Sequence, residues 1–402
     1  MKWQVSFAAF SGLFFGLEAA LWLLLTLRTE KVSSRTKRVI AVPLLLGVLF
    51  VPAIFSCPLR GFELTYSAFG IGSILRLVDL YWIIPRREGR QVYLSPDQLS
   101  VEAWAPLRRT KGRDGTAKST AAEQEAEGRI SASDKKSIWR LAVSVLVWYF
   151  ATDVLGSWLM TFGAQEVVDL VAKYPAYFAL WSLIAMAGVA CVFNLYGRVS
   201  QLCYILFSLR TLHYDPDEWP LVMPHPYLAT SISDFWSKRW HQIFRRTWVS
   251  FAYKPVLRST QAFAKLYAHH IPSARHLIAS MSSALASLSV FAVSGFMHEY
   301  IALVSFQREY YKPGRQMLFF VSHGLAVVFE AIVSQSFTLS FPGRKLLGWI
   351  WVMAFGYWTF PWFFQPYMRD QIWHILSHHP TVCKNFVHNL CKEGWIWCGK
   401  DM

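Results

Sequence analysis

The sequence predicts an all-helical integral membrane protein with about eight transmembrane helices. Three observations support this fold class. Charged residues make up only 16% of the 402 residues and hydrophobic residues 54%, whereas about a quarter of the residues in a soluble domain are charged. The hydrophobic residues gather in runs of about 20, the length that a helix needs to cross a bilayer. Many Lys and Arg residues lie between these runs, as in cytoplasmic loops.

The apolar runs follow one another along the chain. We interpret the first run as a transmembrane helix, because it is longer than the apolar core of a signal peptide and lacks a small-residue cleavage site. The short sixth run could continue the fifth as one long helix. The runs are Val5–Leu27, Val39–Phe55, Phe62–Ile84, Ile138–Phe162, Tyr174–Phe193, Val199–Leu212, Leu277–Phe306, Met317–Ser340 and Leu346–Phe364.

The formal net charge of +15 fits either a nucleic-acid-binding protein or a membrane protein with basic cytoplasmic loops. The basic residues between Arg28 and Arg38 lie directly between the first two apolar runs, which favours the membrane protein. No nucleic acid partner is therefore expected. The segment Arg86–Ser137 is also basic, and two spans separate it from the first loop, so both lie on the cytoplasmic side.

We expect one membrane-embedded domain over residues 1–402, with two hydrophilic segments. Residues 86–137 have the Gly-, Ala-, Ser- and Thr-rich composition of a disordered cytosolic loop. Residues 213–276 combine several prolines with many Trp and Tyr residues, which favours an ordered cytosolic or interfacial segment.

The six cysteines form no C-x-x-C pair, so the sequence signals neither a zinc site nor a redox motif. Three of them, Cys383, Cys391 and Cys398, lie in the C-terminal tail. They could form a disulfide if the tail faces an oxidising lumen.

A first segment with chemical potential begins at Ser231. Ser231 and Asp234 have the spacing of a capping box, which predicts that a helix begins here, and Pro255 predicts that it ends at Lys254. Asp234 and His241 fall on a polar face of this helix together with Lys238 and Arg245. The opposite face would carry Trp236, Trp240, Phe244, Trp248 and Phe251.

An amphipathic helix lying in the membrane interface would explain these aromatic residues. Such a helix has no need for Asp234 or His241, so an interfacial helix and a functional segment both remain open. The basic residues Lys238, Arg239, Arg245 and Arg246 suit the phosphates of a nucleotide-like ligand and equally suit anionic lipid headgroups.

A second segment, Phe291-Ala-Val-Ser-Gly-Phe-Met-His298-Glu299, lies within an apolar run. Ser294 and several earlier serines share a helix face with His298, and close helix packing explains those serines. It does not explain His298 and Glu299, because ionisable residues within a span usually face a cavity and mark function. Glu299 points about 100° away from His298 on a helix, so it would orient another group.

Other ionisable residues in apolar runs are expected to be structural. Arg76 and Asp79 are three residues apart and would neutralise each other. A stretch with His374, His378 and His379 is similar to one box of a di-iron site, but such sites need several converging histidine clusters, so no metal is expected. Structural roles are expected for Glu18, Asp153, His323 and Glu330.

The two segments resemble the wax synthase-like branch of the membrane-bound O-acyltransferase superfamily. The similarity rests on Ser-x-Ser-Asp-Phe-Trp-x-x-Arg-Trp-His from Ser231 and Phe-x-x-Ser-Gly-x-x-His-Glu from Phe291. Phe319-Phe320-x-x-His323-Gly324, followed by Glu330, also resembles that branch. The resemblance covers residues 210–335, and within the branch it is similar to fungal terpenoid and meroterpenoid O-acetyltransferases.

The resemblance implies helices around a central catalytic chamber, which acyl-CoA enters from the cytosol and a lipophilic alcohol from the membrane or the opposite side. It implies acetyl-CoA as co-substrate, no bound cofactor, a terpenoid or meroterpenoid acceptor in secondary metabolism, and a location in the endoplasmic reticulum membrane among its lipids. A long-chain acyl-CoA wax-ester synthase and a membrane transporter are the alternatives.

The resemblance also implies roles for individual residues. The membrane-embedded histidine of the family falls on His298, which would act as general base. A second active-site position, often Asn in the superfamily, falls on His241, which would stabilise the oxyanion or position the acyl group. Substrate-binding roles are expected for Asp234, Trp236, Arg239, Trp240, Ser294 and Glu299.

Overall fold

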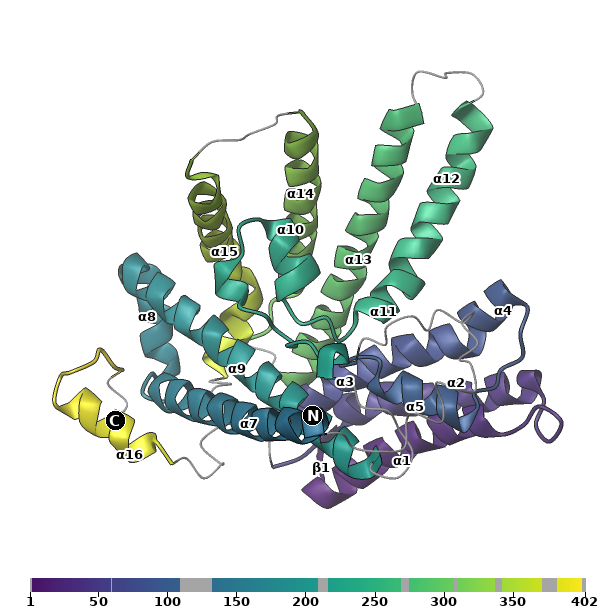
Figure 1. The fold of residues 1–402 in the computed structure, drawn as a ribbon, viewed down its shortest axis with the longest axis horizontal. Coiled ribbons are helices and arrows are strands. Elements are labelled where there is room, and N and C mark those ends of the chain that lie inside the picture. Colours follow the sequence, from purple (N-terminus) through teal and green to yellow (C-terminus); the bar gives the residue numbers. More distant parts are fainter. Residues whose placement is uncertain are drawn as a thin grey trace. The chain divides into compact units, whose positions relative to one another are not determined.

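The computed structural model is almost entirely helical in the parts of the chain that it describes (Figure 1). Its contacts divide the chain into two compact units. Unit 1 consists of residues 1–103, 244–344 and 354–372, and unit 2 of residues 104–243, 345–353 and 373–402. The described residues are 2–58, 60–108, 132–208, 216–268, 275–306, 310–336, 342–370 and 382–399.

Unit 1 begins with three long helices whose starts follow from the sequence. Ser6 caps α1 by accepting a hydrogen bond from the amide of Ala9, and Ser33 caps α2 by accepting one from Thr36. The short strands β1 and β2 pair in parallel. The elements are β1 (Trp3–Gln4), α1 (Phe7–Thr26), α2 (Ser34–Ile54), β2 (Phe55–Ser56), α3 (Arg60–Val78), the π-helix η1 (Asp79–Ile83), α4 (Ile84–Glu88) and α5 (Pro96–Trp104).

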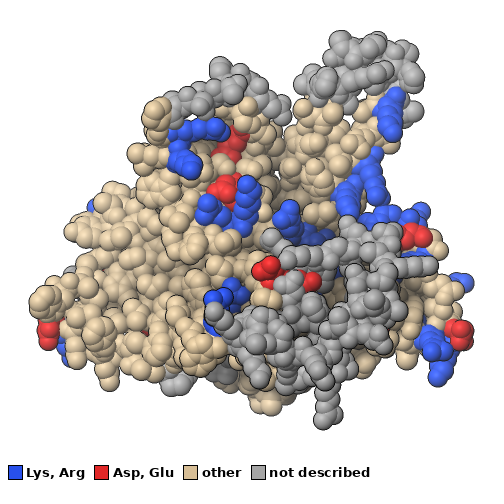
Figure 2. Space-filling view, in the orientation of Figure 1, with Lys and Arg blue, Asp and Glu red and all other residues tan. Residues whose placement is uncertain are grey.

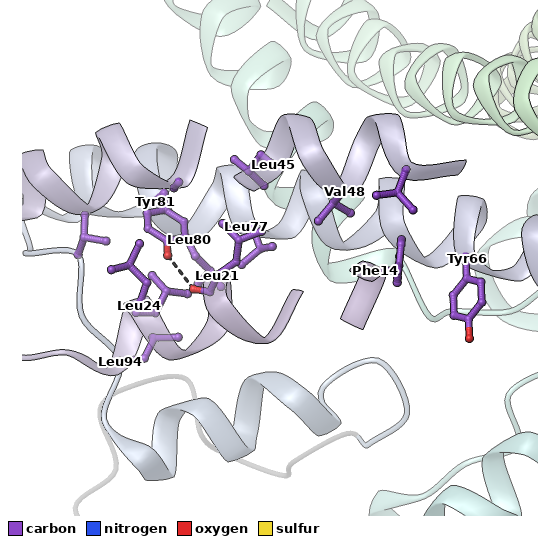
Figure 3. Close-up of a cluster of buried hydrophobic side chains, with 14 of the residues drawn as sticks. Phe14, Leu21, Leu24, Leu45, Val48, Tyr66, Leu77, Leu80, Tyr81 and Leu94 are labelled. Atoms are coloured by element: carbon purple, nitrogen blue, oxygen red, sulfur yellow. Dashed lines mark hydrogen bonds between the residues drawn. The ribbon is translucent and has the colours of Figure 1, made fainter. Parts of the chain in front are cut away.

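Helices α1, α2 and α3 bury one apolar core between them (Figure 3). Tyr81, at the end of this core, is fully buried and donates its hydroxyl hydrogen to the carbonyl of Leu21 at 2.7 Å. The hydrogen bond satisfies a polar group that would otherwise be costly to bury. The core includes Phe14, Leu21, Leu24, Leu45, Val48, Tyr66, Leu77, Leu80 and Leu94.

The second half of unit 1 centres on α13, which packs against α3, α12 and α14. Gly295 of α13 lets α14 approach closely, since a Cβ at this position would lie 2.9 Å from Sδ of Met317 and 3.3 Å from Cβ of Phe320. The elements are α11 (Arg245–Trp248), the π-helix η6 (Val249–Tyr253), α12 (Lys254–Ala268), α13 (Arg275–Ser305), α14 (Arg315–Ser336) and the second part of α15 (Arg344–Arg369).

Unit 2 is built on α7 and α9, which pack against each other, while α8 packs on α9 and α16 on α7. The apolar runs Tyr174–Phe193 and Val199–Leu212 form the single helix α9 as far as Ser208, which is one of the two arrangements that the sequence left open. The elements are α7 (Ala132–Leu159), α8 (Ala164–Lys173), α9 (Pro175–Ser208), the short helices η3 (Pro216–Glu218), η4 (Pro226–Leu228) and α10 (Ile232–Asp234), the π-helix η5 (Phe235–Arg239), the first part of α15, and α16 (Lys384–Lys392).

The C-terminal tail of unit 2 is fastened to the end of α7. The Asp153 carboxylate accepts hydrogen bonds from the amides of Val382 and Cys383 at 2.9 and 2.8 Å. The amide of Gly399 donates to Thr161 Oγ1 at 3.0 Å. Two of the three tail cysteines that could pair, Cys391 and Cys398, form a disulfide.

Seven helices within the described ranges are long and apolar enough to cross a membrane, which confirms the fold class of a polytopic all-helical membrane protein. In Figure 2 the surface over α7 and α9 carries few charged side chains. Helix α15 covers the predicted span Leu346–Phe364 but is not among the seven, because its Trp, Tyr, Gly and Pro residues lower its mean hydropathy. The spans are Phe7–Thr26, Ser34–Ile54, Glu63–Glu88, Ile138–Leu159, Pro175–Leu206, Ala279–Ser305 and Arg315–Ser334.

Parts of the predicted disordered loop 86–137 are helical in the structure: its start includes the end of α4 and the whole of α5, and residues 132–137 belong to α7. Helix α5 forms here because Ser95 caps it, accepting from the amide of Gln98 at 3.2 Å, and because Glu102 pairs with Arg76 at 2.7 Å. Residues 109–131 and the histidine-rich stretch 374–379 lie outside the described residues. The single membrane-embedded domain remains a prediction.

Three of the ionisable residues predicted to be structural, Glu18, Arg76 and Asp79, have polar partners within unit 1. Arg76 forms the expected ion pair with Asp79. Glu18 accepts a hydrogen bond from Ser73 Oγ at 2.6 Å, so a carboxyl group in the middle of α1 is not left without a donor.

Candidate active site

His298 lies near the end of α13, in unit 1, against aromatic side chains from two other helices. Its ring stacks on Phe320 of α14 with 4.6 Å between centroids and an interplanar angle of 18°. The ring of Phe363 in α15 meets it edge-on at 5.2 Å. Because these rings restrict rotation of the imidazole, His298 is held in one orientation while remaining partly accessible.

The close approach of α14 brings Phe320 to His298. Gly295 makes this approach possible, and it stands one residue after Ser294. Ser294 precedes His298 by about one helical turn, so both side chains project from the same face of α13. This face of α13 carries two of the three residues that the sequence singled out on this span, and the third is Glu299.

Glu299 faces different partners from His298, as the 100° offset predicted. Its carboxylate accepts a hydrogen bond from the Tyr311 hydroxyl at 2.6 Å and from the Met317 amide at 3.0 Å. Burial and, in second place, the hydrogen bond to Glu299 raise the pKa of Tyr311, so the phenol stays protonated and donates at neutral pH. Through these two hydrogen bonds, Glu299 fixes the segment that connects α13 to α14. Glu299 is the residue directly after His298.

His323, on α14, has the structural surroundings that were expected of it. It is buried, its Nε2 lies 3.0 Å from Thr359 Oγ1, and its ring contacts Phe319 at 4.3 Å between centroids. The histidine thus joins α14 to α15 within unit 1.

The segment that carries His241 begins as predicted and then departs from the prediction. Ser231 Oγ accepts a hydrogen bond from the Asp234 amide at 2.8 Å, which confirms the helix start. The predicted continuous helix to Lys254 is wrong: α10 passes into the π-helix η5, which ends at Trp240 with extended backbone, and helix resumes only at Arg245. The five aromatic residues therefore do not form one helix face.

The predicted stop at Pro255 is also wrong. The π-helix η6 runs directly into α12, and Pro255 lies in the first turn of α12. A wider π-helical turn before the proline relieves the clash between the proline ring and the preceding turn, which a regular α-helix could not avoid.

Asp234 and Arg239 pair with each other. Arg239 Nε lies 2.6 Å from Asp234 Oδ2, and a second guanidinium nitrogen donates to the carbonyl of His225 at 3.2 Å. His225 has a left-handed backbone with φ of 51°, which is uncommon for a residue other than glycine. The ion pair thus braces the turn Pro224-His225-Pro226 against η5.

His241 follows the break, within unit 2. Its ring stacks on Phe193 of α9, with 5.1 Å between centroids and an interplanar angle of 11°. Its Nδ1 is buried, and burial lowers the pKa of His241 to about 4, an effect that its own backbone hydrogen bond opposes only in part. His241 is therefore neutral at the pH of a cell.

The two predicted tryptophans pack next to His241. Trp240 contacts its ring at 5.5 Å, and Trp236 meets Trp240 edge-on at 5.8 Å. The side-chain amide of Gln242 donates to the carbonyls of both tryptophans, at 3.0 and 2.7 Å. These bonds fix the extended backbone that ends η5.

The predicted site residues fall into two groups, each in its own unit. Ser294, His298 and Glu299 lie on α13 in unit 1, and the others lie in unit 2 between α10 and the break. Sequence reasoning missed the aromatic partners of both histidines. Phe320 stands in a motif that the sequence did single out, but nothing in the local pattern marks Phe193 or Phe363 as neighbours of a histidine. The unit 2 group is Asp234, Trp236, Arg239, Trp240 and His241.

The chain matches a known family over the segment that holds both histidines. Residues 219–322 match the family model of the Membrane bound O-acyl transferase family. The resemblance drawn from the motifs is thereby supported over the segment that carries them. No solved structure matches the chain.

Curated relatives agree with that match. The chain is 29% identical over 169 residues to "Probable long-chain-alcohol O-fatty-acyltransferase 7" of Arabidopsis thaliana, covering 40% of this chain and 45% of that protein. It is 29% identical over 142 residues to "Acyl-CoA--sterol O-acyltransferase 1" of the same plant, covering 35% and 36%. It is 24% identical over 157 residues to "Acetyltransferase eriL" of Hericium erinaceus, covering 39% and 38%.

These alignments span less than half the length of each relative. His241 and His298 both lie within residues 219–322, the segment that matches the family model.

Proposed function

We propose that this protein is a membrane-bound O-acyltransferase, which transfers an acyl group from acyl-CoA to a hydroxyl group of a lipophilic alcohol. The observation that carries the proposal is His298: an ionisable residue on a candidate membrane span, held by two aromatic rings, inside the segment that matches the acyltransferase family. Within a span, such a residue is usually functional.

His298 would act as the general base. An alcohol is a weak nucleophile at neutral pH, so a base must take its proton as its oxygen attacks the thioester carbonyl carbon. A C–O bond then forms, the C–S bond breaks, and the CoA thiolate leaves and receives the proton from His298. The products are an ester and CoA thiol, and the histidine is returned to its neutral form.

His241 would act as a neutral hydrogen-bond donor. Because its pKa of about 4 keeps it uncharged, its ring N–H can stabilise the negative charge that develops on the carbonyl oxygen. Trp236 and Trp240 would form the wall beside the substrate. Their packing against His241 supports this role.

The remaining predicted site residues would act mainly by positioning. Arg239 and Asp234 hold the turn before η5, and Glu299 holds the start of α14 next to His298. Ser294, half-buried one turn before His298, would contact the acceptor alcohol.

For the donor we propose acetyl-CoA, and for the acceptor a terpenoid or meroterpenoid alcohol of secondary metabolism. The fungal relative named an acetyltransferase and the relative named as acting on sterols support a short acyl group and a polycyclic alcohol. We propose the endoplasmic reticulum membrane as its location.

A long-chain acyl-CoA wax-ester synthase is the second candidate. It is favoured by the plant relatives that are named for long-chain alcohols.

The reaction class is tested by release of CoA thiol from membranes that contain the full chain. With acetyl-CoA supplied, thiol should appear only when a hydroxylated terpenoid is added, because the base acts on the attacking alcohol. A transporter would release no thiol with any alcohol, and that result would contradict the proposal. Competition between acetyl-CoA and palmitoyl-CoA then decides between the two donors, since the preferred donor suppresses transfer of the other.

A further inference from the structure

Unit 1 contains a pocket of about 330 Å³ in which half of the lining residues are basic, and His298 is not among them. Figure 2 shows Lys and Arg side chains gathered over α12 and the adjoining end of α4. The lining residues are Trp82, Ile83, Arg86, Arg87, Ser250, Lys254, Pro255 and Arg258. Four of these eight residues are cations and none is an acid.

Two helices supply the cations in a fixed geometry. Arg86 and Arg87 come from the last turn of the span Glu63–Glu88, and Lys254 and Arg258 from successive turns of α12, four residues apart and thus on one face. All four cations line the same pocket.

A buried polar network holds the floor of this pocket. Ser250 Oγ donates to Asp79 Oδ1 at 2.7 Å, and Asp79 is paired with Arg76. Arg76 also pairs with Glu102, which in turn pairs with Arg246 at 2.9 Å. Asp79 and Glu102 are therefore paired with Arg76 and Arg246, and neither of these two cations lines the pocket.

The lining cations have a surplus of positive charge. Arg87 pairs with Glu88 at 2.9 Å, but within the described part of the chain no acid lies within ion-pair distance of Arg86, Lys254 or Arg258. All three are exposed to solvent. Like charges gathered around one space repel each other, and a bound anion would remove that cost.

The position of the pocket indicates the kind of anion. It opens at the end of a membrane span, where Trp82 precedes Arg86, and tryptophan at a span end marks the level of the lipid headgroups. The basic loops put this end on the cytosolic side, and that leaflet carries the anionic lipids. Basic pockets beside spans on this side are typical sites for phosphate-bearing headgroups.

We propose that this pocket binds the phosphate group of an anionic phospholipid in the cytosolic leaflet. Arg86, Lys254 and Arg258 would contact the phosphate, while Trp82 and Pro255 would contact the adjoining glycerol and acyl chains. The phosphates of CoA share the same chemistry, so the experiment must separate the two sources. The proposal stands independently of the acyl-transfer reaction, because it concerns binding alone.

The test measures lipid binding to the purified full-length chain in a neutral detergent. Dioleoyl phosphatidic acid and dioleoyl phosphatidylcholine are titrated separately, and bound lipid is followed by native mass spectrometry and by the melting temperature. The wild type should bind phosphatidic acid in preference to phosphatidylcholine. The double variant Lys254→Ala/Arg258→Ala should bind phosphatidic acid about 25-fold more weakly, at about fivefold for each cation near the surface.

Lys265→Ala provides the matched control. It removes the same charge from an exposed position of the same helix, outside the pocket, so its affinity for phosphatidic acid should equal that of the wild type. Arg86→Ala, on the other helix, should weaken binding about fivefold. Because this variant leaves α12 unchanged, its weaker binding could not result from unfolding of α12.

Three results would overturn the proposal. One is equal affinity of the wild type for the two lipids. Another is equal loss in the double variant and in Lys265→Ala, which would indicate a general charge effect. The third result comes from a parallel titration with CoA. If the double variant loses its affinity for CoA but keeps its affinity for phosphatidic acid, the pocket binds a soluble phosphate ligand and not a lipid.

Discussion

At the scale of single residues, the orientation of His298 is set by side chains that lie far from it in the sequence. Phe320 and Phe363 contact its ring from α14 and α15, and Gly295 lets α14 come close enough for the stack. In the proposed role of general base, the nitrogen of His298 must be held at the attacking oxygen, so these apolar contacts would be part of the catalytic geometry.

Replacing Phe320 by Leu should lower kcat about fivefold while KM changes little. The substitution keeps an apolar side chain but removes a ring stack worth about 1 kcal/mol, so His298 gains freedom to rotate. Steady-state kinetics in microsomes measure the effect. Phe329→Leu, at an exposed position of the same helix, is the control and should behave as the wild type. Equal kcat in the two variants would refute the orienting role of Phe320.

His241 should make the stability of the protein depend on pH. Its pKa is near 6.5 in the unfolded chain and about 4 in the folded one, so the unfolded state binds the extra proton. The stabilisation from keeping His241 neutral is present above pH 6.5 and is lost as the pH falls from 6.5 towards 4.

The variant His241→Gln should therefore lose less stability than the wild type between pH 7 and pH 5. Melting temperatures in detergent at the two pH values measure this difference. His388→Gln serves as a control, and it should show the same fall in melting temperature as the wild type. A fall of equal size in His241→Gln would mean that burial does not keep His241 neutral.

At the scale of elements, the sequence predicts where helices begin better than how they continue. Ser231 and Asp234 locate a helix start because capping is local chemistry. The break after Trp240 depends on Gln242 holding two backbone carbonyls and on His241 stacking against α9, and neither contact leaves a periodic signal. The π-helical turns η5 and η6 also change the angular position of the side chains that follow them. The three- and four-residue spacing of the sequence does not reveal this change.

A single methyl group added at Gly295 should disturb the packing of α13 against α14. In Gly295→Ala the new Cβ would lie 2.9 Å from Sδ and 3.1 Å from Cα of Met317, so α14 must move. We expect a loss of about 1–3 kcal/mol of stability and of most of the activity. Gly356→Ala on α15, whose Cβ meets nothing within 4 Å, is the control.

Thermal unfolding and acyl transfer are measured on both glycine variants. A Gly295→Ala protein as stable and as active as Gly356→Ala would show that the close contact does not matter. At the candidate site, then, the residue types could be predicted from the sequence, whereas their neighbours are set by tertiary packing.

At the scale of the whole molecule, the fold class follows from composition, but the side reached by the tail does not. Contacts within unit 2 indicate the side of the membrane on which the tail lies. The tail is bound to the end of α7 through Asp153 and Thr161, while the start of α7 follows the basic loop. If this loop is cytosolic, the tail lies on the opposite side, where the disulfide Cys391–Cys398 is stable.

In intact microsomes we therefore expect Cys391 and Cys398 to be protected from a membrane-impermeant reductant and a maleimide reagent. The protein for this test has its remaining cysteines replaced by Ser. Labelling should appear only after detergent opens the vesicles. Gly112→Cys, in the basic loop, is the control and should react without detergent. Labelling of the tail in intact vesicles would place it in the cytosol and contradict this topology.

The most direct test of the central claim is acyl transfer in microsomes with His298→Ala beside the wild type. Labelled acetyl-CoA or palmitoyl-CoA is supplied with a panel of hydroxylated terpenoids and long-chain alcohols, at matched protein levels. His388→Ala, on α16, controls for the loss of an imidazole elsewhere. We predict labelled ester with the wild type and with His388→Ala, and at least a hundredfold less with His298→Ala, as for loss of a general base. Ester formation by His298→Ala at the wild-type rate would contradict the role of His298.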